Sequence, residues 1–122
     1  MYGKEVIIDL SDAAVSMFNR RAIGRFFDYL CTEILKVQVC DRHFWDDVGV
    51  PPEEQQTDPK TKGTTAVQFL LFSNVTIHTL DLVGKVYINI FVCREFDIDR
   101  AVDFSRMFFN AVIEKVTIVE RT

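Results

Sequence analysis

Three consecutive segments rich in β-branched and aromatic residues constrain the fold of this chain more than any other feature. They cover residues 64–72, 75–80 and 85–92. Valine, isoleucine, threonine, phenylalanine and tyrosine at this density favour β-strands. The pairs Ser73-Asn74 and Val83-Gly84 lie at or near the two turns between the segments. Because connections this short join strands that run in opposite directions, the region predicts three consecutive antiparallel strands.

A long amphipathic segment precedes this region. Between residues 12 and 35, apolar side chains recur at three- and four-residue steps, which predicts a helix with one buried face. These residues are Val15, Phe18, Ile23, Phe26, Phe27, Leu30 and Ile34. Residues 19–21 are a candidate break, and Ser11 is the expected N-cap because its hydroxyl can accept a backbone N–H. Residues 4–10 and 36–41 favour strands before and after this helix.

A second helix is predicted over residues 98–112, capped by Asp97 or Asp99 and followed by a short strand at residues 116–119. The order of elements is strand, helix, strand, loop, three strands, helix, strand. This order predicts an α+β fold: a two-layer sandwich in which a mainly antiparallel sheet carries its helices on one face. A chain of 122 residues with 48% hydrophobic content can bury one core, so residues 1–122 are expected to form a single domain.

Composition argues against several classes of protein. No apolar run reaches the roughly 18 residues that cross a bilayer, and no signal peptide is recognisable, so we expect a cytoplasmic protein without a membrane partner. Three cysteines without close spacing predict free thiols and no metal site. A net charge of −4 with scattered basic residues argues against nucleic-acid binding.

Residues 43–63 contain all three prolines and an acidic run, and they are predicted to form a long, solvated loop rather than a lid. Eleven phenylalanines in a chain of this size indicate either a densely aromatic core or a buried dimer face. Both interpretations are open at this point.

A serine, a histidine and a cysteine follow one another within and just after the β-rich region. The stretch Phe72-Ser73-Asn74-Val75-Thr76-Ile77-His78-Thr79 is preceded by Gly63-Thr64-Thr65-Ala66 and followed by Cys93. In this order the residues resemble the short bacterial and archaeal S-adenosylmethionine decarboxylases, a pyruvoyl-dependent family. The spacing matches without a gap from Gly63 to Cys93 and more loosely over the first 40 residues. The chain is identified as a divergent member of that family.

The resemblance implies a self-processing enzyme. In the family, the proenzyme cuts itself before a serine and converts that serine into a covalent pyruvoyl group, so Ser73 corresponds to the catalytic serine and cofactor precursor. His78 corresponds to the group that moves protons during cleavage, a role suited to an imidazole. Thr65 corresponds to the hydroxyl that polarises the scissile carbonyl. Cys93 corresponds to the acid that returns a proton after decarboxylation.

The spacing of the first two residues sets a condition on the structure. His78 follows Ser73 by five residues, and on one regular strand this separation puts the side chains on opposite faces. For both to act on the same bond, Ser73 is expected in the turn and His78 in the strand. Each residue also has an ordinary structural explanation: a hairpin turn at Ser73-Asn74, a half-buried strand histidine, and a small core cysteine.

Two further residues are candidates for substrate binding. His43-Phe44-Trp45 resembles a family motif that carries an adenine-stacking aromatic, which makes Trp45 the candidate. After Ile77-His78-Thr79 the family has Trp-Pro-Glu, whose glutamate holds the ribose hydroxyls, and this chain has Leu80-Asp81-Leu82. Asp81, one position away, is the carboxylate candidate there.

Departures from the family pattern leave three hypotheses. Phe72 stands where the family has glutamate, Asn74 where it has histidine, and Leu82 where it has the ribose-binding glutamate. The favoured hypothesis is a homodimeric lyase that decarboxylates S-adenosylmethionine for polyamine and spermidine biosynthesis. The second is an uncleaved, non-enzymatic homologue that acts as a binding or regulatory subunit. The third is a pyruvoyl decarboxylase for a different amino acid or a related small molecule.

Overall fold

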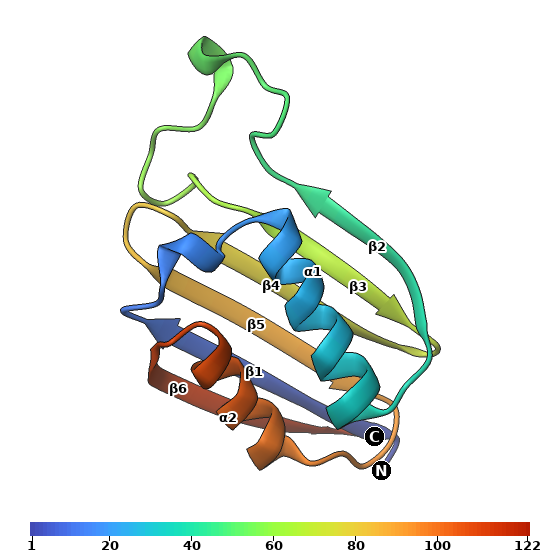
Figure 1. The fold of residues 1–122 in the computed structure, drawn as a ribbon. Coiled ribbons are helices and arrows are strands. Elements are labelled where there is room, and N and C mark those ends of the chain that lie inside the picture. The colour runs from blue at the N-terminus through green and yellow to red at the C-terminus, as the bar shows by residue number, and fades with distance from the viewer.

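The computed structural model describes all 122 residues and contains one six-stranded sheet with two helices against one of its faces (Figure 1). The strand order is β2-β3-β4-β5-β1-β6, and every neighbouring pair is antiparallel. In chain order the strands and α-helices are β1 (Gly3–Ser11), α1 (Arg20–Tyr29), β2 (Val39–Trp45), β3 (Thr65–Leu70), β4 (Ser73–Leu80), β5 (Lys85–Val92), α2 (Ile98–Phe108) and β6 (Val112–Arg121). Short 3₁₀ segments η1 (Val15–Met17) and η3 (Pro52–Glu54) and a π-helical segment η2 (Leu30–Leu35) complete the chain.

The predicted α+β two-layer architecture is confirmed. β3 pairs with β4, and β4 pairs with β5, both antiparallel and in the order that the sequence predicts. β1 pairs with β5 on one side and with β6 on the other. The two termini therefore lie close together at one end of the sheet (Figure 1).

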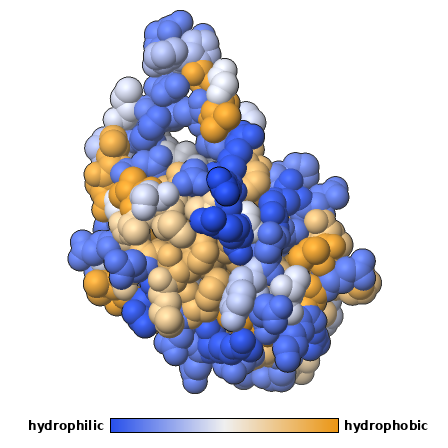
Figure 2. All heavy atoms as spheres, in the orientation of Figure 1, coloured by the Kyte–Doolittle hydropathy of each residue, from blue (hydrophilic) through white to orange (hydrophobic).

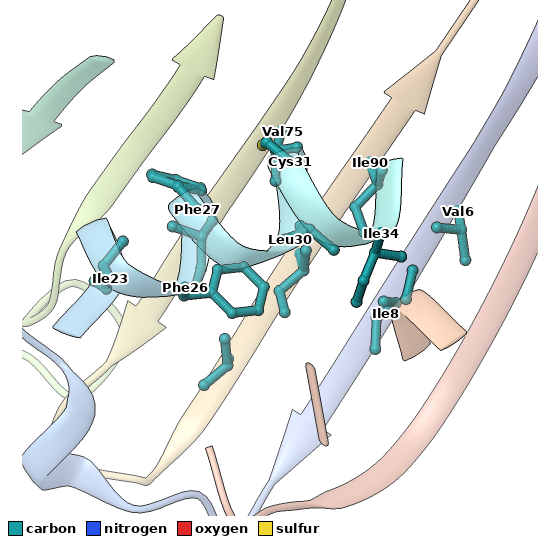
Figure 3. Close-up of a cluster of buried hydrophobic side chains, with 14 of the residues drawn as sticks. Val6, Ile8, Ile23, Phe26, Phe27, Leu30, Cys31, Ile34, Val75 and Ile90 are labelled. Atoms are coloured by element: carbon teal, nitrogen blue, oxygen red, sulfur yellow. The ribbon is translucent and has the colours of Figure 1, made fainter. Parts of the chain in front are cut away.

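The core forms where the helices cover the sheet. Side chains of α1 and η2, among them Phe26, Leu30 and Ile34, point toward buried residues of the strands (Figure 3). The ring of Phe26 also meets those of Phe104 and Phe109, with centroids 5.5 and 5.2 Å away. Burying one side chain of this size contributes about 1.5–3 kcal/mol. Aromatic packing thus holds α1 and α2 to each other and to the sheet.

The opposite face of the sheet carries no helix (Figure 1). Along β4, alternate residues from Ser73 to Thr79 are buried on the helix side, and those between them are half-buried on the bare side. The bare side also presents apolar side chains from three other strands: Ile7, Val67, Phe69, Tyr87 and Phe91. Phe69 is 46% exposed. Contiguous apolar groups on an exposed face are typical of an interaction surface.

The start of the first helix differs from the prediction. Ser11 is the last residue of β1, and its hydroxyl donates to the carboxylate of Glu114 at 2.5 Å, so it caps nothing. Asn19 is the N-cap of α1, and its side chain accepts the N–H of Ala22 at 2.9 Å. The candidate break at residues 19–21 is therefore where the helix begins. After Leu30 the helix widens to π-type and ends at Lys36, whose φ is 55°.

Three strand boundaries also differ. Ser73-Asn74 is not the turn: the turn consists of Leu71 and Phe72, and Ser73 opens β4 opposite Leu70. β2 extends to Trp45, into the segment predicted as loop. β6 has 10 residues and begins at Val112, because it pairs along the whole of β1 and not only over the predicted residues 116–119. Asp97 caps α2, which confirms one of the two predicted alternatives.

Replacing Asn19 by alanine should lower the free energy of unfolding by about 1 kcal/mol, because the N–H of Ala22 loses its side-chain acceptor. Urea denaturation followed by circular dichroism measures the change. The Asn19→Asp variant keeps a capping oxygen and serves as the control. Equal urea midpoints for the alanine variant and the unaltered protein would contradict the assignment of the cap.

Candidate active site

Ser73 and Cys93 meet at one end of the sheet. Cys93 directly follows β5, and its backbone N–H donates a hydrogen bond of 3.1 Å to Ser73 Oγ. Ser73 is 6% exposed and belongs to the helix-covered row of β4, whereas Cys93 is half-buried. Antiparallel pairing of β4 with β5, which sets Asn74 opposite Phe91, brings the two segments together. The contact between this serine and this cysteine is made through the cysteine backbone.

The peptide bond before Ser73 lies in a strained turn. Phe72 has φ of 63°, in the left-handed region that favours glycine or asparagine. Its side chain cannot offset this cost by burial, because the residue is 73% exposed. A bulky residue in such a backbone conformation costs about 1–3 kcal/mol and persists only where the surrounding structure enforces it. Here the paired strands on both sides, β3 and β4, enforce it.

Thr65 and His78 meet at the other end of β4. They are directly opposite in the β3–β4 register, and Thr65 Oγ1 lies 2.6 Å from His78 Nδ1. Both side chains are half-buried on the bare face of the sheet. The hydrogen bond fixes the ring of His78 through Nδ1, and its Nε2 makes no hydrogen bond within the chain.

The chain by itself does not bring these two pairs together. Ser73 lies in β4 itself rather than in the turn, so the predicted condition for joining it with His78 fails. The two side chains are on opposite faces of the sheet, and a separation of five residues along a strand corresponds to about 17 Å. His78 of the same chain therefore cannot reach the bond before Ser73.

Trp45 lies beside the Thr65–His78 pair. It is the last residue of β2, pairs with Thr65 in the register and is 83% exposed. Together with Thr65 and His78 it lines a cavity of about 440 Å³, whose remaining walls come from residues 46–63. The loop projects from the sheet at this end (Figure 1), and the space-filling view shows a hollow at its base (Figure 2).

The loop is held in place by ion pairs and internal hydrogen bonds. Arg20, at the start of α1, donates two hydrogen bonds of 2.7 Å to the carboxylate of Asp46. Lys62 donates one of 2.7 Å to Asp47 and so joins the two ends of the loop. The hydrogen bond from Arg20 holds the pKa of Asp46 below its usual range. The segment is a long and mostly exposed loop, as predicted, and these contacts anchor its ends.

Asp81 does not share the cavity of Trp45. It lines a neighbouring hollow of about 250 Å³ with Lys62 and Gly63, and it accepts a hydrogen bond of 3.1 Å from the hydroxyl of Thr79. Burial raises the pKa of Asp81, and the hydrogen bond from Thr79 opposes this effect. At Gly63 a Cβ would lie 1.7 Å from the carbonyl oxygen of Thr79, so only glycine allows the loop to join β3 this closely to β4.

The thiol of Cys31 lies outside the candidate site. Cys31 is fully buried among core residues, and burial raises the pKa of its thiol to about 12, so it is a neutral core side chain. The structure contains no group of three or more histidine, cysteine, aspartate or glutamate side chains arranged to hold a metal ion. None of its helices has the length and apolar character to span a membrane.

Comparison with known proteins identifies the family. The model of the S-adenosylmethionine decarboxylase family matches residues 4–122. The chain belongs to that family. Its fold is similar to the crystal structure of the adenosylmethionine decarboxylase from Aquifex aeolicus, with a TM-score of 0.68 over 97% of this chain and 87% of that chain. Sequence identity is 17%, so this likeness concerns the fold. No curated protein sequence gives a significant match.

The predicted membership of the S-adenosylmethionine decarboxylase family is therefore confirmed, and this family is one of carboxy-lyases. Two features of the site were not found from the sequence. The strained conformation of Phe72 has no signal in the residue type, since phenylalanine is uncommon at such a position. The contribution of the loop to the cavity depends on the distant contact between Arg20 and Asp46.

At pH 7, removing the charge of Asp46 should lower the free energy of unfolding, whereas removing the charge of Asp81 should raise it. A carboxyl with a lowered native pKa stabilises the fold above its unfolded value of about 3.9, and this contribution is lost as the pH falls through the native pKa. A raised native pKa means that the ionised Asp81 costs stability at neutral pH, and the cost disappears below about pH 3.9.

Urea midpoints of the Asp46→Asn and Asp81→Asn variants at pH 7 and in acid measure this difference. At pH 7 the first midpoint should fall and the second should rise relative to the unaltered protein. Both differences should shrink in acid. Midpoints that move in the same direction at pH 7 would contradict the assigned environments.

Proposed function

We propose that this member of the family is a self-processing, pyruvoyl-dependent decarboxylase that acts on S-adenosylmethionine as a homodimer and serves polyamine and spermidine biosynthesis. The observation that carries the proposal is the left-handed backbone of Phe72 directly before Ser73. Strain at a residue is found disproportionately where the backbone takes part in function. Here it falls on the residue whose carbonyl carbon the serine hydroxyl would attack.

The cleavage that we propose uses only atoms of the chain and water. Ser73 Oγ attacks the carbonyl carbon of Phe72, the C–N bond to residue 73 breaks, and the freed nitrogen takes the hydroxyl proton, which leaves an ester. Removal of the Cα proton of residue 73 expels Phe72 as a carboxylate and leaves a dehydroalanine. Addition of water to the tautomeric imine releases ammonia and leaves the pyruvoyl group. Loss of the turn geometry in the first step releases the strain at Phe72.

The residues present fit this cofactor. Ser73 is its chemical precursor and opens a strand. The bond before it lies in an exposed two-residue turn, so breaking this bond would leave the packing of the core intact. The pyruvoyl group, when formed, supplies an electron sink for decarboxylation of an amine-bearing substrate. Cys93 is the proposed proton donor, because its segment is already joined to Ser73 by a hydrogen bond.

Assembly of the site requires a second copy. The Thr65–His78 pair lies on the bare face at one end of β4, and the exposed turn that holds the Phe72–Ser73 peptide bond lies at the other end. A two-fold axis between two bare sheet faces would set the Thr65–His78 pair of one copy near this turn of the other. The apolar side chains of the bare face, including Phe69 and Phe91, supply surface for such an interface. In this arrangement Thr65 and His78 assist cleavage of the partner chain.

The uncleaved homologue is the second candidate, and one observation favours it. Ser73 is buried and accepts a hydrogen bond from a backbone N–H, which is also how an ordinary structural serine behaves. Such a protein would use the same bare face to bind an active decarboxylase. The two candidates differ in whether the chain breaks before Ser73.

The intact mass of freshly purified, untagged protein after incubation at neutral pH separates them. We expect the 14.1 kDa chain to split into two fragments before residue 73, with the C-terminal one carrying the mass of a pyruvoyl group. The Ser73→Ala variant should stay whole. A single unbroken mass for the unaltered protein would overturn the proposed enzyme and leave the binding subunit.

Relieving the strain at Phe72 should slow cleavage. Glycine adopts the left-handed conformation without cost, so Phe72→Gly removes about 1–2 kcal/mol of ground-state strain, equivalent to a rate roughly 5- to 30-fold lower. The Phe72→Leu variant keeps a Cβ in the same conformation and should cleave at close to the original rate. The rate is followed by mass spectrometry during incubation, and a glycine variant that cleaves as fast as the leucine variant would show that strain has no part in the reaction.

A further inference from the structure

The segment that follows β5 and carries Cys93 has no backbone pairing. None of residues 93–96 takes part in a backbone–backbone hydrogen bond. The N–H of Cys93 donates instead to Ser73 Oγ, and this hydrogen bond joins the segment to the candidate site. A segment without backbone hydrogen bonds opens easily unless other contacts fix it. The position of Cys93 therefore depends on the side chains around it.

Arg94 anchors this segment to the end of η2. Nη2 of its guanidinium donates hydrogen bonds of 3.2 Å to the carbonyl oxygen of Leu35 and of 2.7 Å to that of Lys36. The last carbonyls of a helix have no partner within it, and the left-handed backbone of Lys36 ends the helix here. Hydrogen bonds from a charged donor are roughly twice as strong as neutral ones. Arg94 thus satisfies the helix end and fixes the backbone next to Cys93.

The other contacts of the segment are weaker or lie further from Cys93. Lys4 forms an ion pair of 3.1 Å with Glu95, but the Glu95 side chain is 66% exposed, and exposed ion pairs contribute little. Phe96 packs against the core, which holds the segment where it leads into α2. Arg94 is therefore the residue that orients Cys93.

We infer that Arg94 is a positioning residue for self-cleavage, because it keeps the N–H of Cys93 on the hydroxyl oxygen that attacks Phe72. This inference rests on the proposed function. As Ser73 Oγ gives up its proton, a fixed donor aimed at the oxygen stabilises the charge that develops there. Arg94 makes no hydrogen bond to Ser73, so it acts through the backbone of its neighbour.

Replacing Arg94 by methionine keeps an apolar stem and removes the charged donors. We expect cleavage, followed by mass spectrometry, to be about tenfold slower, a loss typical of one charge-assisted hydrogen bond. The Arg94→Lys variant keeps a charged donor and should restore part of the rate. The matched control is Arg100→Met, because Arg100 belongs to α2 and donates to the carbonyl of Glu33 in the same η2 at 3.2 Å. This control should lose similar stability in urea and cleave at the original rate.

Hydrogen exchange at the Cys93 amide tests the inference without cleavage. It is followed by NMR in the His78→Ala chain, which keeps Ser73 and is expected to stay whole. Adding Arg94→Met should make exchange at Cys93 about tenfold faster, while Arg100→Met leaves it unchanged. The paired amides of β5 should keep their protection in both variants, which distinguishes loss of position from loss of stability.

Two results would overturn the inference: an Arg94→Met chain that cleaves as fast as the Arg100→Met chain, or one whose Cys93 amide exchanges no faster. Failure of the unaltered protein to cleave would instead overturn the proposed function. In that case the exchange measurement would still decide whether Arg94 positions Cys93 against Ser73.

Discussion

The antiparallel pairing of β3, β4 and β5 is the constraint on which the rest of the structure depends. It puts Thr65 directly opposite His78 and brings the backbone of Cys93 to the hydroxyl of Ser73. Because β4 is extended and its side chains alternate, the same pairing keeps the two pairs on opposite faces and at opposite ends. In the proposed enzyme the sheet therefore supplies two half-sites, and a complete site would need two copies of the chain.

The pairing also maintains the strained backbone conformation of the turn before Ser73. Ser73 belongs to the buried row of β4 with Val75 and Ile77, and the helices cover that row. Slipping the register by one residue would turn this apolar row toward solvent. The burial of the core thus fixes where β4 begins and leaves only Leu71 and Phe72 to reverse the chain. In this way the stability of the core maintains the conformation that the proposed cleavage uses.

Much of the fold could be predicted from residue patterns, because the alternation in β4 and β5 and the apolar stripes of the helices are local signals. The candidate residues Ser73, His78 and Cys93 were identifiable from their order. Their placement was not, because serine and asparagine are the residue types expected in a turn, whereas the chain turns at Leu71-Phe72 and buries Ser73. The loop is exposed as predicted, but its anchoring could not be predicted, because the contact of Asp46 with Arg20 joins segments far apart in the sequence.

The central claim is that one copy of the chain completes the site of another. Co-expression of two differently tagged chains, one Ser73→Ala and one His78→Ala, tests it through the masses of the isolated mixed dimer. The account predicts that the His78→Ala chain, which keeps Ser73, is cleaved in the mixed dimer and stays whole when it is expressed alone. A His78→Ala chain that stays whole in the mixed dimer, while the unaltered protein cleaves, would contradict the account.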